Sequence, residues 1–315
     1  MYNVQEIEEN INLCDGFNGR FLYDEPLADK TTFKVGGSAR IFVEPFDIKS
    51  FQNFVCLAKK MMFPFLVMGG GSNIVVPDEG ISYPVLSTGG LKNISLKDDN
   101  RLVCDSGCTM ESIVNFCLEH SLAGMERFAG LPGTIGGALF MNARCYDISI
   151  SDLVDKVTYL DENGEIQVYH FDSNDWDYKK SPFQEKFNSS TILCAELKVK
   201  PAESDLPEIK AEADSYIKDR NDKGHFRYPS AGSVFKNNRN FGKPSGKIID
   251  ECGLKGFAIG GAQVAPWHGN LIINTGNASA KDIYDLTYCV ADKVFEQTGF
   301  KLEPEIIFLT SSKQL

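Results

Sequence analysis

The chain has 315 residues, of which 43% are hydrophobic and 24% charged, with a formal net charge of −11. This composition is that of an ordinary globular protein, and the length allows two or three compact units with cores of their own. The acidic balance argues against a nucleic-acid binder, because phosphate contacts need a basic face. No hydrophobic run is long enough to span a membrane and the acidic N-terminus is not a secretory signal, so we expect a cytoplasmic protein without a membrane partner.

The first third of the chain predicts a β-α-β unit. The first thirty residues are weakly patterned and predict a helix followed by a loop. Residues 31–45 then predict a strand, a turn at Gly36-Gly37 and a second strand. Asp47 is a candidate N-cap, and a strand and glycine turn at 63–76 complete the unit. The helix after Asp47 would bury one face, made of Phe51, Phe54, Val55 and Ala58.

The middle of the chain predicts a helix and three strands. Thr109 can cap a helix that ends near Gly124, because hydrophobic residues follow it at helical spacing. Residues 156–161 and 164–169 flank an Asn-Gly turn, which is a hairpin signal, and residues 191–199 form a further strand.

The last third predicts a linker and two helices. Residues 201–207 have the composition of a linker, and a charged helix follows from about 208 to 220. The last helix would begin after Ser279 and end before Gly299. Its buried face would consist of Ile283, Leu286, Val290 and Val294.

The cysteines and histidines form no metal or redox motif. The nine cysteines are scattered without C-x-x-C spacing, so we expect most to be reduced and buried. The four histidines show no metal-ligand pattern, and no metal site is predicted. The cysteines are Cys14, Cys56, Cys104, Cys108, Cys117, Cys145, Cys194, Cys252 and Cys289.

Two glycine-rich segments are candidates for binding an anion. Residues 128–142 carry four glycines and a proline between a helical pattern and a strand-like pattern, and Gly69–Asn73 lies between two apolar runs. Glycine N–H groups can line a concave surface that holds a pyrophosphate; the alternative is a pair of glycine-rich turns. Neither segment has the spacing of a Rossmann loop or a P-loop, which suggests a different nucleotide-binding fold.

Two further segments contain polar groups that could take part in chemistry. Small residues around Ser233 would let its hydroxyl approach a ligand, with Lys236 and Asn237 nearby; the alternative is a common turn. Glu303 and Glu305, considered alone, would be solvated charges beside a strand at residues 306–309.

Six motifs occur in the order seen in the UDP-N-acetylenolpyruvoylglucosamine reductases, also called UDP-N-acetylmuramate dehydrogenases. The chain resembles this family over about residues 15–310. The motifs are Thr32-x-x-Val-Gly-Gly37, Gly69-Gly-Gly-Ser-Asn73, Gly130-Leu-Pro-Gly-Thr-Ile-Gly-Gly137 with Met141-Asn142, Ser230-Ala-Gly-Ser-Val-Phe-Lys-Asn237, Gly260-Gly-Ala-Gln263 and Leu302-Glu-Pro-Glu305.

The resemblance implies an α+β protein that binds FAD non-covalently. Its FAD-binding domain would have the vanillyl-alcohol-oxidase (PCMH-like) fold in two subdomains, and an α+β substrate-binding domain would follow. NADPH would reduce FAD, and UDP-N-acetylglucosamine enolpyruvate would then accept hydride at C3, giving UDP-N-acetylmuramate for peptidoglycan. We expect a monomer. The implied boundaries are an N-terminal extension 1–15, an FAD-binding domain 16–202 with subdomains of about 16–76 and 77–202, a substrate-binding domain 203–305 and a C-terminal strand and tail 306–315.

The resemblance also implies the site residues. Ser233 would protonate C2 of the substrate, and the carboxyl of Glu305, in its protonated form, would help hold the intermediate in which negative charge develops there. The third catalytic position is Lys179. The implied FAD ligands are Val35, Gly36, Gly37, Gly69, Gly70, Gly71, Ser72, Asn73, Gly130, Pro132, Gly133, Thr134, Gly136, Gly137 and Asn142. The implied substrate ligands are Tyr178, Lys223, Asn237, Gln263 and His268.

The chain departs from the family pattern near the substrate carboxylate. Lys179 stands where the family has an arginine, and lysine lacks the planar two-pronged donor that binds a carboxylate bidentately. Lys180 or another cation could compensate. Arg144 and Cys145 stand where small residues are usual, and the short connection between Phe183 and Thr191 resembles the type II branch.

Two other functions fit these departures. One is a different flavin oxidoreductase with an altered carboxylate site; the other is a flavin- or nucleotide-sugar-binding protein without activity, against which the intact Ser233 and Glu305 argue. An anionic substrate would be attracted by a local patch, for which the candidates are Lys223, Arg227, Lys236 and Arg239, although the same residues could be ordinary solvated surface.

Overall fold

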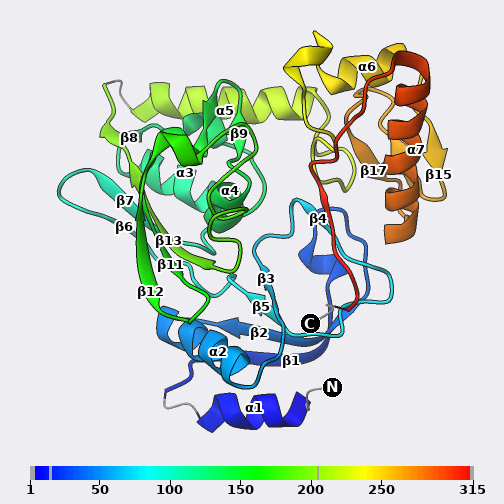
Figure 1. Cartoon of the computed structure of the whole chain (residues 1–315). Helices are drawn as coiled ribbons and strands as arrows, with labels where there is room; N and C mark the ends of the chain where they lie inside the picture. The colour runs from blue at the N-terminus through cyan, green and yellow to red at the C-terminus, as the bar shows by residue number, and fades with distance from the viewer. Residues whose placement is uncertain (1–3, 14–15, 204–205, 313–315) are drawn as a thin grey trace.

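The computed structural model describes residues 4–13, 16–203 and 206–312. Its first part is a four-stranded sheet in the order β1-β2-β5-β3, with α2 packed on it and α1 beneath α2 (Figure 1). The predicted β-α-β unit is present, but β5 lies between its two strands. The predicted helical face of α2 is buried and Asp47 caps it by accepting a hydrogen bond from the Ser50 N–H at 2.7 Å. The bounds are α1 Val4–Leu13, β1 Gly19–Pro26, β2 Ser38–Pro45, α2 Ile48–Lys60, β3 Leu66–Met68 and β5 Val85–Ser87.

Two predictions for this part are wrong. The expected loop before residue 30 contains β1, an edge strand whose residues are mostly accessible, so it lacks the alternation that reveals a half-buried strand. The expected strand after residue 31 is a turn, because Lys34 has a left-handed φ of 58° and the Thr32 N–H donates to the Gly71 carbonyl at 3.1 Å.

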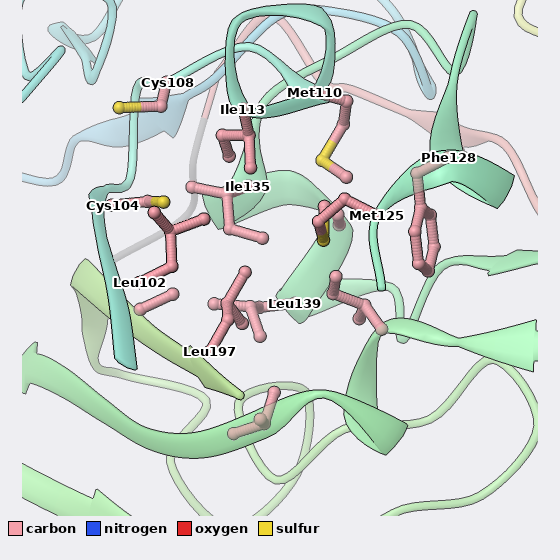
Figure 2. Packing of buried hydrophobic residues seen from close by; sticks show 14 of the residues in the cluster. Leu102, Cys104, Cys108, Met110, Ile113, Met125, Phe128, Ile135, Leu139 and Leu197 are labelled. Carbon is pink, nitrogen blue, oxygen red and sulfur yellow. The ribbon is translucent and has the colours of Figure 1, made fainter. Parts of the chain in front are cut away.

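The second part is an antiparallel five-stranded sheet in the order β12-β11-β13-β7-β6. The predicted hairpin is confirmed as β11 and β12, and the predicted strand after it is β13. Helices α3 and α4 pack on the sheet, and Figure 2 shows Ile113 of α3 and Leu139 of α4 close to Leu102 and Leu197 of the strands. The bounds are β6 Ile94–Leu96, β7 Arg101–Asp105, α3 Met110–Glu119, α4 Ile135–Phe140, β11 Val154–Leu160, β12 Ile166–His170 and β13 Thr191–Lys198.

Helix α4 was not predicted, because the strand-like pattern after Gly137 is in fact helical. Thr134 caps this helix by accepting from the Gly137 N–H at 3.4 Å, and its buried face has helical spacing. Two glycines in the first turn lower the intrinsic helix propensity of this segment, so the sequence pattern did not indicate a helix. Thr109 caps α3 as predicted, but α3 ends at Glu119 rather than near Gly124.

The third part contains α6, α7 and the antiparallel sheet β15-β16-β17, and α5 leads to it from the second part (Figure 1). The charged helix α5 is confirmed. The last helix, α7, is confirmed with both ends: Ser279 forms a capping box with Asp282, and Gly299 ends the helix at a φ of 75°. The bounds are α5 Leu206–Asp222, α6 Ser245–Glu251, β15 Ala258–Ile259, β16 Ala262–Val264, β17 Ile272–Asn274 and α7 Ala280–Thr298.

Short elements complete the fold. Two further pairs of two-residue strands are β8 Leu122–Ala123 with β14 Lys200–Pro201, and β9 Arg144–Cys145 with β10 Ile148–Ser149. The 3-10 helices are Ala28–Lys30, Glu126–Phe128, Ile150–Asp152, Ser173–Asp175 and Arg239–Phe241.

The end of the chain returns from the third part to the first. Strand β18 (Ile307–Phe308) pairs in parallel with β4 (Ile74–Val75), and Figure 1 shows this segment descending from α7 toward β4. The glycine turn at residues 69–73 therefore joins strands of two different sheets. Asp78 also accepts hydrogen bonds from the first N–H groups of α7, at 2.7 Å from Ala280. These contacts hold the third part against the first, and the domain boundaries named above stay a prediction.

No disulfide joins the eight cysteines in the described part of the chain. Four of them are buried as expected (Cys104, Cys108, Cys117 and Cys145), three are half-buried and Cys56 is exposed; Cys14 lies outside the described residues. Burial raises the pKa of the Cys117 and Cys108 thiols to about 12, so both are held as neutral thiols.

Candidate active site

The two glycine-rich segments meet each other. A Cβ added to Gly70 would lie 2.8 Å from the Gly133 Cα, and one added to Gly69 would lie 2.6 Å from the Thr134 Oγ1. Both distances are shorter than a Cβ tolerates, so only glycine allows this approach. The two segments, far apart in the sequence, thus form one continuous wall of backbone.

Three buried hydroxyl groups face the same wall without a hydrogen-bond partner among the described residues. They belong to Thr32, Thr88 and Ser106, and all three residues line one cavity. A buried hydroxyl without a partner is costly, so such groups in a cavity indicate a polar ligand. Gly136 lies over Ser106, where an added Cβ would come within 2.9 Å of the Ser106 Cβ. Glycine backbone and free hydroxyls together fit the pyrophosphate of a dinucleotide.

The cavity has a volume of about 1500 Å³ and lies where the three parts of the molecule meet. It brings together fifteen of the site residues predicted from the sequence. These are Gly69, Gly70, Gly71, Ser72, Asn73, Pro132, Thr134, Gly136, Gly137, Lys179, Lys223, Ser233, Asn237, His268 and Glu305. The predicted residues that do not line it are Val35, Gly36, Gly37, Gly130, Gly133, Asn142, Tyr178 and Gln263.

The predicted residues outside the cavity lining have visible packing or hydrogen-bonding roles. Asn142 is buried: its amide Nδ2 donates to the Asp177 carbonyl at 2.8 Å, and its Oδ1 accepts from the Ser151 N–H at 3.3 Å. The Tyr178 hydroxyl accepts from the Asn237 N–H at 3.2 Å. The Gln263 side chain donates to the Gly256 carbonyl at 3.1 Å within the third part.

The glycines outside the lining and Val35 serve the packing around it. Val35 is buried in the core of the third part, together with Val75. A Cβ on Gly36 would lie 2.5 Å from the Val76 Cβ, and one on Gly133 would lie 2.4 Å from the Ser72 Oγ. The first of these glycines packs the segment before β2, and the second packs the glycine wall itself.

Lys179 and Glu305, which both line the cavity, form an ion pair. The Lys179 Nζ lies 2.6 Å from the Glu305 Oε1, and their side chains are only 13% and 11% exposed. Lys179 holds a left-handed φ of 57° in the turn that presents it. The expectation that the two C-terminal carboxylates are solvated charges is correct for Glu303, whose side chain is 69% exposed, and wrong for Glu305.

Ser233 lies beside Glu305 because two segments pair next to it. The Glu305 N–H donates to the Val234 carbonyl at 2.7 Å, and the Asn73 Nδ2 donates to the Glu305 carbonyl at 3.0 Å. The serine, the glutamate and the end of the Gly69–Asn73 loop are therefore fixed relative to one another by backbone hydrogen bonds.

A group of cations and histidines also lines the cavity. Lys223 pairs with Asp219 at 2.6 Å, and the Tyr146 hydroxyl donates to the same carboxylate at 2.9 Å. Of the predicted anion patch, Lys223 and Arg227 line the cavity, whereas Lys236 and Arg239 do not. Sequence reasoning missed Tyr146 and Asp219, which carry no motif of their own.

His225 is a further cavity residue that the sequence did not indicate. Its ring centroid lies 5.8 Å from that of His268. Burial lowers the pKa of His225 to about 4 and also lowers that of His268, so both rings are neutral at pH 7. The Asn270 N–H donates to the His268 Nδ1 at 3.1 Å, which leaves the Nε2–H as a donor.

The structure gives no sign of a metal centre or a membrane segment within the residues it describes. No group of three or more His, Cys, Asp or Glu side chains there could hold a metal ion. None of the helices is both long and apolar enough to cross a bilayer.

Comparison with known protein families gives matches to two separate parts of the chain. Residues 224–309 match the family described as UDP-N-acetylenolpyruvoylglucosamine reductase, C-terminal domain, and residues 39–169 match an FAD binding domain. The UDP-N-acetylenolpyruvoylglucosamine reductase of Treponema denticola is 42% identical over 320 residues, 98% of each chain. That of Borreliella burgdorferi is also 42% identical and covers 90% of this chain and 92% of its own. The crystal structure of the Thermus caldophilus reductase superposes with a TM-score of 0.76 at 28% identity, over 93% of this chain and all of that one.

Proposed function

The chain belongs to the family of UDP-N-acetylenolpyruvoylglucosamine reductases, and from this premise we propose how its own residues carry out the reaction. It is an FAD-dependent oxidoreductase that makes UDP-N-acetylmuramate, a peptidoglycan precursor. Its substrates are NADPH and UDP-N-acetylglucosamine enolpyruvate. We further propose that it acts in the cytoplasm as a monomer of the shorter, type II branch.

The glycine wall is the proposed cofactor site. The backbone N–H groups of residues 69–73 would hold the pyrophosphate of FAD, and the free hydroxyls of Thr32, Thr88 and Ser106 would donate to its polar groups. The N–H groups of Ile135, Gly136 and Gly137 already donate within the protein. Reduced FAD supplies the hydride that C3 of the enolpyruvyl group receives. Side chains of the protein would then stabilise the negative charge on C2 and the attached carboxylate and supply the proton to C2.

Ser233 is the proposed proton donor to C2 of the substrate. Hydride addition at C3 leaves negative charge on C2 and the attached carboxylate, and a basic carbon of this kind can take a proton from a hydroxyl held beside it. Lys179 and Glu305 line the same cavity as Ser233, and the ammonium group would stabilise the charge as it develops. Lys223, Asn237 and His268 line the same cavity and would hold the UDP portion.

The observation that carries this proposal is the placement of Ser233 next to the Lys179–Glu305 pair, in the cavity that the two glycine-rich segments also line. Ser233→Ala tests it in the anaerobic holoenzyme. NADPH should bleach the flavin at the wild-type rate, and reoxidation by the enolpyruvyl substrate should slow by about 100-fold or more. Ser233→Cys keeps a proton donor and should recover part of the rate. Reoxidation of Ser233→Ala at the wild-type rate would remove Ser233 from the mechanism.

A further inference from the structure

Arg144 is a cation that lines the cavity and has no role in the mechanism proposed above. It lies on β9, lines the cavity, and its guanidinium has no hydrogen bond or ion pair with any residue in the described ranges. The family pattern expects a small residue at this position. A free guanidinium in an anion-binding cavity is a donor set without an acceptor.

The other cations that line the cavity already have protein partners. They are Lys34 (Asp29 carbonyl, 2.8 Å), Lys179 (Glu305, 2.6 Å), Lys223 (Asp219, 2.6 Å), Arg220 (Ala129 carbonyl, 3.0 Å) and Arg227 (over the Trp267 ring, 5.0 Å). Among the described residues that line the cavity, Arg144 is therefore the cation that has no hydrogen bond, ion pair or aromatic-ring contact with the protein.

The segment that carries Arg144 is hydrogen-bonded to the turn that carries Lys179. Asn142, two residues before Arg144, donates to the Asp177 carbonyl at 2.8 Å, and the Ser181 hydroxyl donates to the Phe140 carbonyl at 2.7 Å. These bonds tie the segment that carries Arg144 to the turn that carries Lys179. The Arg144 side chain is exposed whereas the neighbouring Cys145 is buried, so the guanidinium stays accessible to a ligand that enters the cavity.

The substrate carboxylate needs a cation as its partner in the cavity. Lys179 is engaged by Glu305 and lacks the planar fork of the arginine that the family has there. Lys180 does not replace it, because that side chain pairs with Glu185 at 3.4 Å and does not line the cavity. We propose that Arg144 binds the carboxylate of the enolpyruvyl substrate, so that Arg144 and Lys179 together perform the work of the missing arginine.

This inference rests on the proposed function, and its test separates the two. Arg144→Ala, Arg144→Lys and, as the matched control, Lys180→Ala are purified with flavin and reduced anaerobically by NADPH. Reoxidation is then followed against the concentration of UDP-N-acetylglucosamine enolpyruvate. For Arg144→Ala the half-saturating concentration should rise about tenfold or more, the loss expected for one charge-assisted hydrogen bond. Arg144→Lys should lie between Arg144→Ala and wild type, with reduction by NADPH unchanged in all three variants and Lys180→Ala matching wild type throughout.

Three outcomes would contradict some part of this account. An unchanged half-saturating concentration in Arg144→Ala would make Arg144 ordinary solvated surface. A slower reduction by NADPH with normal reoxidation would assign the guanidinium to a phosphate of the dinucleotide, which overturns the proposal. A wild-type enzyme that is reduced by NADPH but not reoxidised by this substrate would reject the proposed function itself.

Discussion

Gly70→Ala is the substitution that most directly perturbs the contact between the two glycine segments. The added Cβ would lie 2.8 Å from the Gly133 Cα, 3.2 Å from the Gly133 carbonyl carbon and 3.4 Å from the Thr134 nitrogen. All three neighbours are backbone atoms, which cannot rotate away as a side chain can. The two segments must therefore move apart in the variant.

The cost of that separation follows from overpacking, which destabilises proteins by about 1–3 kcal/mol. Because the segments form the wall of the proposed FAD site, displacing them should weaken FAD binding by roughly the same free energy, about 5- to 150-fold in affinity. Gly253→Ala is the matched control. Gly253 has a φ of 72° with no atom near an added Cβ, so this variant should lose about 1 kcal/mol of stability from backbone strain and keep its flavin.

The assay is the flavin content of desalted protein, followed by titration of the apoprotein with FAD. Gly70→Ala should come through desalting with less flavin than Gly253→Ala and should bind added FAD more weakly. If Gly70→Ala keeps full flavin occupancy and wild-type affinity, the two segments do not form the cofactor site.

Three further predictions concern charge, pH and a helix cap. Lys179→Met removes the partner of a nearly buried carboxylate and should lower the free energy of unfolding by about 3 kcal/mol in urea titrations; a loss below about 1 kcal/mol would show that Glu305 is solvated. His225 has a folded pKa of about 4, below that of the unfolded chain, so protonation favours unfolding. Wild type should lose about 2 kcal/mol more than His225→Gln as the pH falls from 6.5 to 4, and parallel pH curves would refute this. Ser279→Ala should cost about 1 kcal/mol by removing the α7 cap, and an unchanged melting temperature would contradict the capping box.

Elements with strong local signals could be predicted from the sequence. Helix α7 has a capping serine, a C-terminal glycine and a regular apolar face, and it was predicted to its ends. Helix α4 could not be predicted, because its Gly136 serves a close contact with Ser106 and lowers the helix propensity of the segment. The edge strand β1 was not predicted, because most of its residues are accessible on both faces and it therefore shows no hydrophobic alternation.

The site could be predicted where a motif carries it and not where tertiary contacts create it. Ser233 and Glu305 come from motifs, and backbone pairing near Val234 brings them together. The free hydroxyls of Thr88 and Ser106 carry no sequence signal, because a threonine or serine is informative only when its surroundings leave it unpaired. The burial of Glu305 likewise depends on Lys179, which lies far from it in the sequence.

The measurement that tests the central claim most directly is the balance of the complete reaction. Purified holoenzyme is incubated anaerobically with NADPH and UDP-N-acetylglucosamine enolpyruvate, and both substrates and the product are quantified by mass spectrometry. The account predicts equal consumption of the two substrates and a product heavier by two hydrogens, with the mass of UDP-N-acetylmuramate. A protein whose flavin is bleached by NADPH while the enolpyruvyl substrate remains unchanged would contradict it.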